Sequence, residues 1–202
     1  IYASIQKMPF IEELTRGTLS SAKFEFYIAQ DSLYIGHFGR TLAMIAAKCA
    51  DHHDALAYIK FAEEALVVEE ALHRSYFQQF NLADTGEMQP ACHHYVHFLR
   101  STAAMDAVEV AMAATLPCFW IYKKVGDYIY VHQEAAGNPY QQWIATYGGA
   151  EFSISVDKAI QLCNQAAQQG SPALRQQMKA AFITASHMEY AFWDAAYNLR
   201  KW

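Results

Sequence analysis

The chain has 202 residues, of which 53% are hydrophobic and 14% aromatic, and its formal net charge is -5. This composition excludes a disordered chain, because disorder requires few apolar residues and a high net charge. The basic residues number 15 against 20 acidic ones and form no basic stripe, so no nucleic-acid partner is expected.

No membrane partner or secretory signal is expected either. The most apolar run, residues 110–122, is too short to span a bilayer and contains Pro117. Residues 1–15 carry charges and lack the apolar segment of a signal peptide. The 4 cysteines are widely spaced and form no C-x-x-C pair, which is typical of reduced thiols in the cytosol. We therefore expect a cytoplasmic protein.

Nearly all of the chain is predicted to be helical, because its 9 glycines and 5 prolines cluster at a few break points. The first long helix should begin after Ser20, a suitable N-cap, and run towards Cys49. Its apolar residues recur at helical spacing and form one stripe: Phe24, Tyr27, Ile28, Tyr34, Ile35, Phe38, Leu42 and Ile45.

Two further helices are expected in the middle of the chain. One should cover residues 55–80 with these side chains facing inward: Leu56, Ile59, Leu66, Leu72, Tyr76 and Phe80. The other should cover residues 94–122, with a break at Pro117, because proline cannot donate the hydrogen bond that continues a helix.

The last third of the chain contains clear helix boundaries. The sequence NPYQ at residues 138–141 resembles a capping box with Pro139 at the first helical position, and this short helix should stop at Tyr147. A helix over residues 151–169 should end at Gly170, and Ser171-Pro172 should start the last one. Because the linkers are short, residues 1–202 are predicted to form a single-domain, all-α helical bundle.

Two carboxylates fall on faces that should be buried. Asp31 lies in the middle of the first apolar stripe, and Glu189 lies in a similar stripe of the last helix. Burial of an isolated charged carboxylate is costly, so each residue needs a partner, a raised pKa or a cavity. Each is interpreted either as a hydrogen-bonded structural anchor or as an acid–base group in a polar cavity inside the bundle.

Cys118 directly follows the proline of an apolar run. A buried free cysteine is usually a small apolar residue, and the other cysteines fit that interpretation. A helix kink at Pro117, however, would open space inside the bundle and leave the thiol facing it. Cys118 is therefore the cysteine whose setting needs an explanation beyond packing.

The chain resembles the TenA / thiaminase II family of aminopyrimidine aminohydrolases, which adopt a haem-oxygenase-like all-α fold. The resemblance extends over nearly the whole chain, through segments that occur in order: QDSLYIGHF (30–38), EEALH (69–73), HHYVHFLR (93–100), LPCFWIYKKVG (116–126), NPYQQWIATYGG (138–149) and MEYAFWDAAY (188–197). Leu33 and Met8 depart from residues found in a relative, but neither position touches the proposed chemistry.

The resemblance implies a role for each candidate site residue. Cys118 matches the nucleophile of the cysteine-containing branch, Asp31 the group that contacts the amino-pyrimidine edge, and Glu189 the group that handles the proton on a ring nitrogen. The residues that match substrate-binding tyrosines are Tyr34, Tyr95, Tyr122 and Tyr147. It further implies a homotetramer and a small-molecule substrate.

The implied reaction is hydrolysis of the C–N bond at the exocyclic methylene of a pyrimidine, in thiamine salvage. The thiol adds to the ring, the leaving group departs, water adds to the methylene, and loss of the thiol restores the ring. The product is 4-amino-5-hydroxymethyl-2-methylpyrimidine, formed from thiamine or from an aminomethylpyrimidine. No metal and no organic cofactor are required.

Three alternatives remain open at this stage. Glu70 and His73 have the E-x-x-H spacing of di-iron carboxylate oxidases, although none of the other histidines follows an acidic residue at that spacing. A haem protein would need an axial histidine, and only His37 adjoins an apolar stripe. A non-catalytic pyrimidine-binding or regulatory protein would leave the combination of a thiol, carboxylates and tyrosines unexplained.

Overall fold

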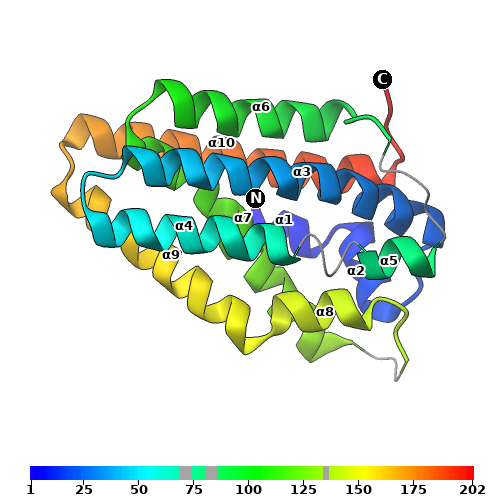
Figure 1. The fold of residues 1–202 in the computed structure, drawn as a ribbon. Helices are drawn as coiled ribbons and strands as arrows, with labels where there is room; N and C mark the ends of the chain where they lie inside the picture. Colours follow the sequence, from blue (N-terminus) through cyan, green and yellow to red (C-terminus); the bar gives the residue numbers. More distant parts are fainter. Residues whose placement is uncertain (69–73, 81–85, 134–136) are drawn as a thin grey trace.

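The computed structural model describes residues 1–68, 74–80, 86–133 and 137–202 (Figure 1). These residues form helices and no strand, which confirms the all-α prediction. The helices are α1 (Tyr2–Gln6), α2 (Pro9–Arg16), α3 (Ser21–Lys48), α4 (His52–Val68), α5 (Arg74–Gln79), α6 (Pro90–Met105), α7 (Val108–His132), α8 (Gln141–Gly148), α9 (Ala150–Gln169) and α10 (Pro172–Tyr197).

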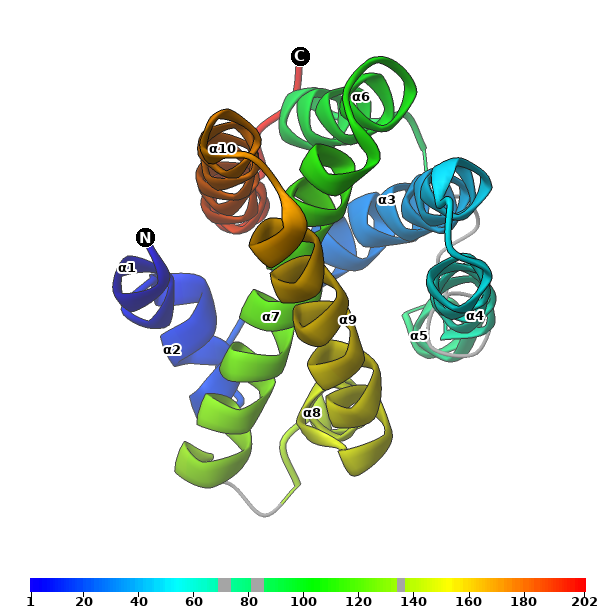
Figure 2. The same ribbon diagram turned by 90° about the vertical axis from the view of Figure 1, so that its left-hand side faces the viewer.

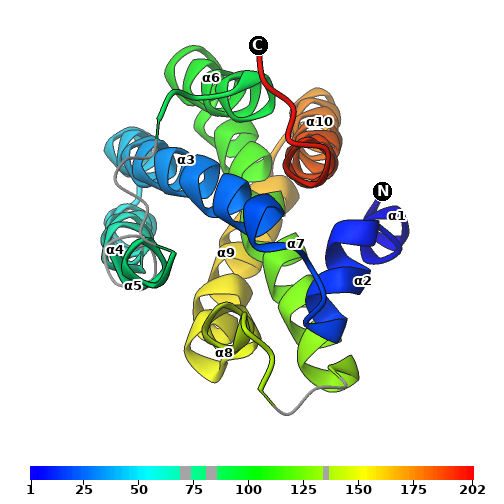
Figure 3. The same cartoon turned by 90° about the vertical axis from the view of Figure 1, so that its right-hand side faces the viewer.

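The longest helices lie side by side, and α7 runs through the middle of the bundle. Figures 2 and 3 show α7 with α10 on one side and α8 and α9 on the other, and α7 packs against all of them. Helix α4 lies on the outside and packs against α3. Within the described residues, no helix is both long and apolar enough to cross a membrane. The centre of the bundle is therefore where side chains of α3, α7 and α10 meet.

Several helix boundaries confirm the sequence-based predictions. Helix α3 begins directly after Ser20 and ends before Cys49. Helix α9 ends at Gln169, directly before Gly170, and the Ser171 hydroxyl accepts a hydrogen bond from the backbone N–H of Leu174 at 3.2 Å. This N-cap satisfies one of the backbone donors that the first turn of α10 leaves free.

The predicted break at Pro117 is wrong. Helix α7 continues through Pro117, and the chain instead breaks at Asp106 and Ala107, whose extended backbones separate α6 from α7. Proline removes only one backbone donor, and packing on several sides holds α7 together through that position. Cys118 thus lies inside a continuous helix.

The predicted inward face of residues 55–80 is also wrong for α4. Leu56 and Ile59 are 51% and 53% exposed, whereas Tyr58 and Phe61 are buried against α3. Both sets recur at helical spacing, so periodicity alone could not decide which set faces the core. Leu66 is likewise exposed at 41%. Farther along, Tyr76 is buried as predicted and Phe80 is half-buried, whereas Leu72 lies outside the described residues.

Helix α8 starts two residues later than the capping-box pattern predicts. Its first residue is Gln141, and Pro139 lies in the preceding turn. The Asn138 side chain accepts from the backbone N–H of Tyr140 at 2.9 Å and donates to the Leu14 carbonyl, also at 2.9 Å. Asn138 therefore tethers this turn to α2 rather than capping α8.

Gly126 permits the close approach of α7 to the end of α8. A Cβ atom at this position would lie 2.5 Å from the carbonyl carbon of Tyr147 and 2.6 Å from its oxygen. Such distances are shorter than real contacts, and the opposing atoms are backbone, which cannot rotate away. Gly126 thus allows α7 to hold Tyr147, a predicted substrate-binding residue, against the bundle centre.

We expect Gly126→Ala to destabilise the protein. In a free helix this change would stabilise by about 1 kcal/mol, but overpacking here should lower the free energy of unfolding by roughly 1–3 kcal/mol. Urea denaturation followed by far-UV circular dichroism measures the free energy of unfolding. Gly148→Ala is the control, because a Cβ atom there would lie 3.3 Å from its nearest neighbour, the Cβ atom of Tyr130. We expect a smaller loss of stability in this variant. A gain in stability for Gly126→Ala would contradict this account.

Candidate active site

Three helices bring the predicted catalytic residues together. Asp31 comes from α3, Cys118 from α7 and Glu189 from α10. Their exposed fractions are 0%, 7% and 1%, respectively. The Cys118 thiol is close enough to both carboxyl groups for their charges to raise its pKa. The two carboxylates on apolar stripes thus lie within electrostatic range of the thiol.

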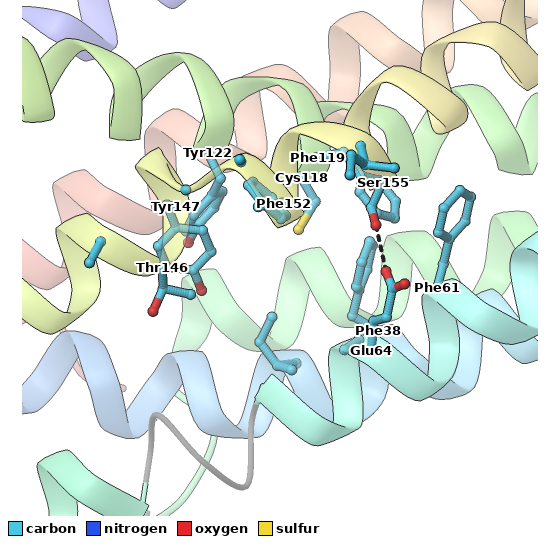
Figure 4. A pocket seen from close by; sticks show the side chains of 16 residues that line it. Phe38, Phe61, Glu64, Cys118, Phe119, Tyr122, Thr146, Tyr147, Phe152 and Ser155 are labelled. Carbon is cyan, nitrogen blue, oxygen red and sulfur yellow. Dashed lines mark hydrogen bonds between the residues drawn. The ribbon is translucent and has the colours of Figure 1, made fainter.

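A cavity of about 700 Å³ opens beside this group, between α3, α4, α7, α8 and α9. Cys118, Tyr122 and Tyr147 lie on its wall, and Figure 4 shows the Cys118 sulfur pointing into it. The remaining candidates are not part of the wall, but are buried next to it: Asp31, Glu189, Tyr34 and Tyr95. The thiol is therefore the reactive group most accessible from the cavity.

Glu189 retains its proton more tightly than an ordinary glutamate. Burial raises its pKa from 4.5 to about 8, and the nearby charge of Asp31 adds to this effect. The Tyr95 hydroxyl donates a hydrogen bond to Glu189 Oε1 at 2.7 Å, which partly opposes the shift. At neutral pH Glu189 is mostly protonated, the state that a general acid needs.

Asp31 is held by a network of aromatic side chains. The Tyr122 hydroxyl donates to Asp31 Oδ1 at 3.4 Å, and it accepts from the Tyr27 hydroxyl and the Trp193 indole, both at 3.3 Å. The Trp143 indole donates to the Tyr27 hydroxyl at 3.1 Å. These bonds fix the orientation of Tyr122 and thereby of the carboxylate.

Sequence-based prediction missed Tyr27, Trp143 and Trp193 as members of this network. The sequence pattern places Tyr27 on a buried apolar stripe, and Trp143 lies in the NPYQQWIATYGG segment. Their polar atoms meet across helices far apart in the sequence. A buried tyrosine or tryptophan usually needs a hydrogen-bond partner. This requirement is the only feature of the sequence that could have indicated the network.

The Cys118 thiol is protonated in the resting protein. Burial, and next the charge of Glu189, raise its pKa well above the usual value of 9.0, whereas the Tyr34 hydroxyl lowers it. That hydroxyl lies close enough to the Cys118 thiol and to the Tyr95 hydroxyl to influence their ionisation, but among the described residues it makes no hydrogen bond of ordinary length and angle. Tyr34 is therefore placed to interact with the thiol or with a bound molecule.

The four predicted substrate-binding tyrosines form two ring pairs. The rings of Tyr34 and Tyr95 lie 4.8 Å apart between centroids, and those of Tyr122 and Tyr147 lie 5.0 Å apart. Burial raises the pKa of all four hydroxyls. They are thus neutral hydrogen-bonding groups beside flat aromatic faces.

The predicted E-x-x-H motif lies outside the described residues, because Glu70 and His73 belong to 69–73. Within the described ranges, no group of three or more histidine, cysteine, aspartate or glutamate side chains is arranged to hold a metal ion. His37 is half-buried, and burial and nearby basic side chains lower its pKa.

Comparisons with known proteins find relatives that match nearly the whole chain. The model of the TENA/THI-4/PQQC family matches residues 1–199. The chain is 31% identical to an aminopyrimidine aminohydrolase of Bacillus subtilis over 96% of this chain and 84% of that protein. It is 30% identical to an aminopyrimidine aminohydrolase of Halalkalibacterium halodurans, over 96% of this chain and 89% of that protein. A TenA homologue from P. horikoshii superimposes with a TM-score of 0.88 at 26% identity, over 98% and 92% of the two chains.

The raised pKa of Glu189 predicts a pH-dependent stability. Between pH 4.5 and about 8 the folded protein retains a proton that an unfolded glutamate has lost. Stability should therefore fall as the pH rises through this window, by at most about 1.4 kcal/mol per pH unit for this one group. Glu189→Gln should show a smaller loss between pH 5 and pH 8 in urea denaturation, and identical losses would contradict the assignment.

Proposed function

Since the chain belongs to the TENA/THI-4/PQQC family, we propose that it is an aminopyrimidine aminohydrolase of thiamine salvage. It hydrolyses the C–N bond at the exocyclic methylene of the pyrimidine and releases 4-amino-5-hydroxymethyl-2-methylpyrimidine. One observation supports this most strongly: Cys118 lies on the cavity wall with a protonated Glu189 buried beside it. A thiol and an acid at one place suit addition to an electron-poor ring.

The proposed binding of the ring uses the groups around Cys118. The Asp31 carboxylate accepts a hydrogen bond from the exocyclic amino group, and Glu189 donates its proton to a ring nitrogen. Tyr122 and Tyr147 lie on the cavity wall, where their rings provide a flat apolar face. The ring carbon beside the one that bears the methylene then faces the thiol.

The proposed reaction proceeds through a covalent adduct. The Cys118 sulfur forms a bond to the ring carbon, the ring nitrogen receives the proton of Glu189, and the thiol proton passes to a neighbouring carboxylate. The electron pair on that nitrogen then expels the leaving group, which departs with the electrons of the C–N bond. Water adds its hydroxyl group to the methylene, and its other proton passes through a carboxylate to an amine leaving group or to solvent. The carbon–sulfur bond then breaks, the sulfur regains its proton, and the ring nitrogen returns its proton to Glu189, which restores the ring.

Protonation of the ring offsets the high pKa of the thiol. An isolated thiolate beside Glu189 and Asp31 is unfavourable, because burial and the charge of Asp31 oppose it, and the charge of Glu189 does so as well once that residue has lost its proton. If the ring nitrogen gains a proton while sulfur loses one, no net charge is created in the buried site, where charge is costly. Glu189 therefore assists the attack as well as the departure of the leaving group.

Further features remain predictions for this chain. The cytoplasmic location and the homotetramer belong to them, as does the choice between thiamine and an aminomethylpyrimidine. A regulatory protein that only binds pyrimidines is the alternative. Incubation with each substrate and detection of the hydroxymethylpyrimidine separates a catalyst from a binder, and no product from either substrate would contradict the proposal.

We predict that Cys118→Ser abolishes turnover, because a hydroxyl is a far weaker nucleophile than a thiol that can lose its proton. Product formation is measured by chromatography, with the far-UV circular dichroism spectrum as the control for folding. Cys163→Ser, which replaces another buried thiol outside the cavity wall, should retain activity. Full activity in Cys118→Ser would remove the nucleophile assignment.

Glu189→Gln should lower the turnover number by roughly 10²-fold or more, the usual scale for the loss of a general acid. The glutamine amide keeps the shape of the side chain but has no proton to transfer. In the wild-type protein, kcat should fall as the pH rises through about 8. Steady-state rates between pH 6 and pH 9 test both expectations. A near-native rate in Glu189→Gln would contradict the general-acid role and leave Glu189 with a structural one.

A further inference from the structure

The cavity is larger than one pyrimidine ring requires. Its volume of about 700 Å³ falls within the range of about 300–1,000 Å³ that is typical of pockets for drug-sized molecules. A single substituted six-membered ring fills only part of this space. The remainder is available to the group attached to the methylene.

Cys118 separates two chemically different ends of the cavity. Figure 4 shows Tyr122 and Tyr147 on one side of the Cys118 sulfur, and Glu64 and Phe61 on the other. The hydrogen bond from Tyr122 to Asp31 (3.4 Å) connects the tyrosine end to the carboxylate that is proposed to bind the ring. A leaving group on the far side of the attacked carbon therefore extends towards Glu64.

The end near Glu64 combines aromatic faces with a negative charge. The ring centroids of Phe61 and Phe119 lie 5.2 Å apart, and those of Phe38 and Phe119 lie 5.5 Å apart. The Ser155 hydroxyl of α9 donates to Glu64 Oε2 of α4 at 2.6 Å. No lysine, arginine or histidine occurs among the described residues that line the cavity. Both aromatic faces and carboxylates attract cations.

We infer that Glu64 is a specificity-determining residue that favours substrates whose leaving group bears a positive charge. The inference rests on the function proposed above and adds which leaving group this site prefers. A quaternary nitrogen, such as that of a thiazolium ring, fits this end of the cavity. An anionic leaving group, such as a phosphate ester, would meet the carboxylate without a basic partner among the described lining residues.

Glu64 should strengthen binding rather than accelerate the reaction. When the C–N bond breaks, the leaving group takes both electrons and its positive charge disappears. The attraction to Glu64 is thus strongest in the bound substrate and weaker in the transition state, which lowers KM without raising kcat. Because Glu64 is exposed, solvent screens the interaction.

The test measures binding in a protein that cannot turn over. In a Cys118→Ser background, Glu64→Gln should raise the Kd for thiamine roughly two- to fivefold, the scale of an exposed ion pair. The Kd for 4-amino-5-hydroxymethyl-2-methylpyrimidine, which has no leaving group, should not change. Isothermal titration calorimetry measures both. The thiamine effect should shrink between roughly 0.01 M and 1 M salt, as the Debye length falls from about 30 Å to about 3 Å.

Glu63→Gln is the matched control, since Glu63 is also exposed on α4 but is not a lining residue. It removes the same charge one residue away and should leave both Kd values unchanged. Three outcomes would overturn the role of Glu64 while the proposed function stands. They are an equal change of the thiamine Kd in the two variants, equal changes of Kd for both ligands in Glu64→Gln, and no change of Kd at all. Failure of Cys118→Ser to bind either ligand would instead count against the proposed function, and the inference would fall with it.

Discussion

Burial of two carboxyl groups beside one thiol is the constraint on which the centre of this bundle depends. Asp31, Cys118 and Glu189 come from α3, α7 and α10 and are almost fully removed from solvent. Such groups are tolerated only when hydrogen bonds and retained protons compensate for the lost water. Hydroxyl groups of Tyr95 and Tyr122 provide the bonds, and Glu189 retains its proton. Tyr27, Trp143 and Trp193 in turn orient Tyr122, a role that leucine side chains could not fill.

The helix ends that could be predicted are those specified by local chemistry. Ser171 and Gly170 mark the junction of α9 and α10 through a side-chain cap and a helix stop, and neither depends on the rest of the fold. The break at Asp106 and the buried face of α4 could not be predicted. Both depend on which neighbour each helix packs against, and the apolar pattern of the sequence was compatible with more than one answer.

The site was predictable to the extent that polar residues lie on apolar stripes. Asp31 and Glu189 were found in this way, and the resemblance to a known family supplied the tyrosines. Glu64 gave no such signal, because a glutamate on a helix beside another exposed glutamate is unremarkable in sequence. Its position against Ser155 of α9 comes from tertiary structure alone. The extent of the domain, residues 1–202, and the assembly stay predictions.

The high pKa of Cys118 has a consequence for the survival of the protein in a cell. Peroxides, disulfides and other electrophiles react with thiolates far faster than with thiols. A thiol that remains protonated is therefore protected from oxidation and from unwanted alkylation. The other buried cysteines, with pKa values of about 11 to 12, share this inertness without the cavity. The protein therefore discriminates between electrophiles before any substrate is bound, because its protonated thiol reacts slowly with most of them.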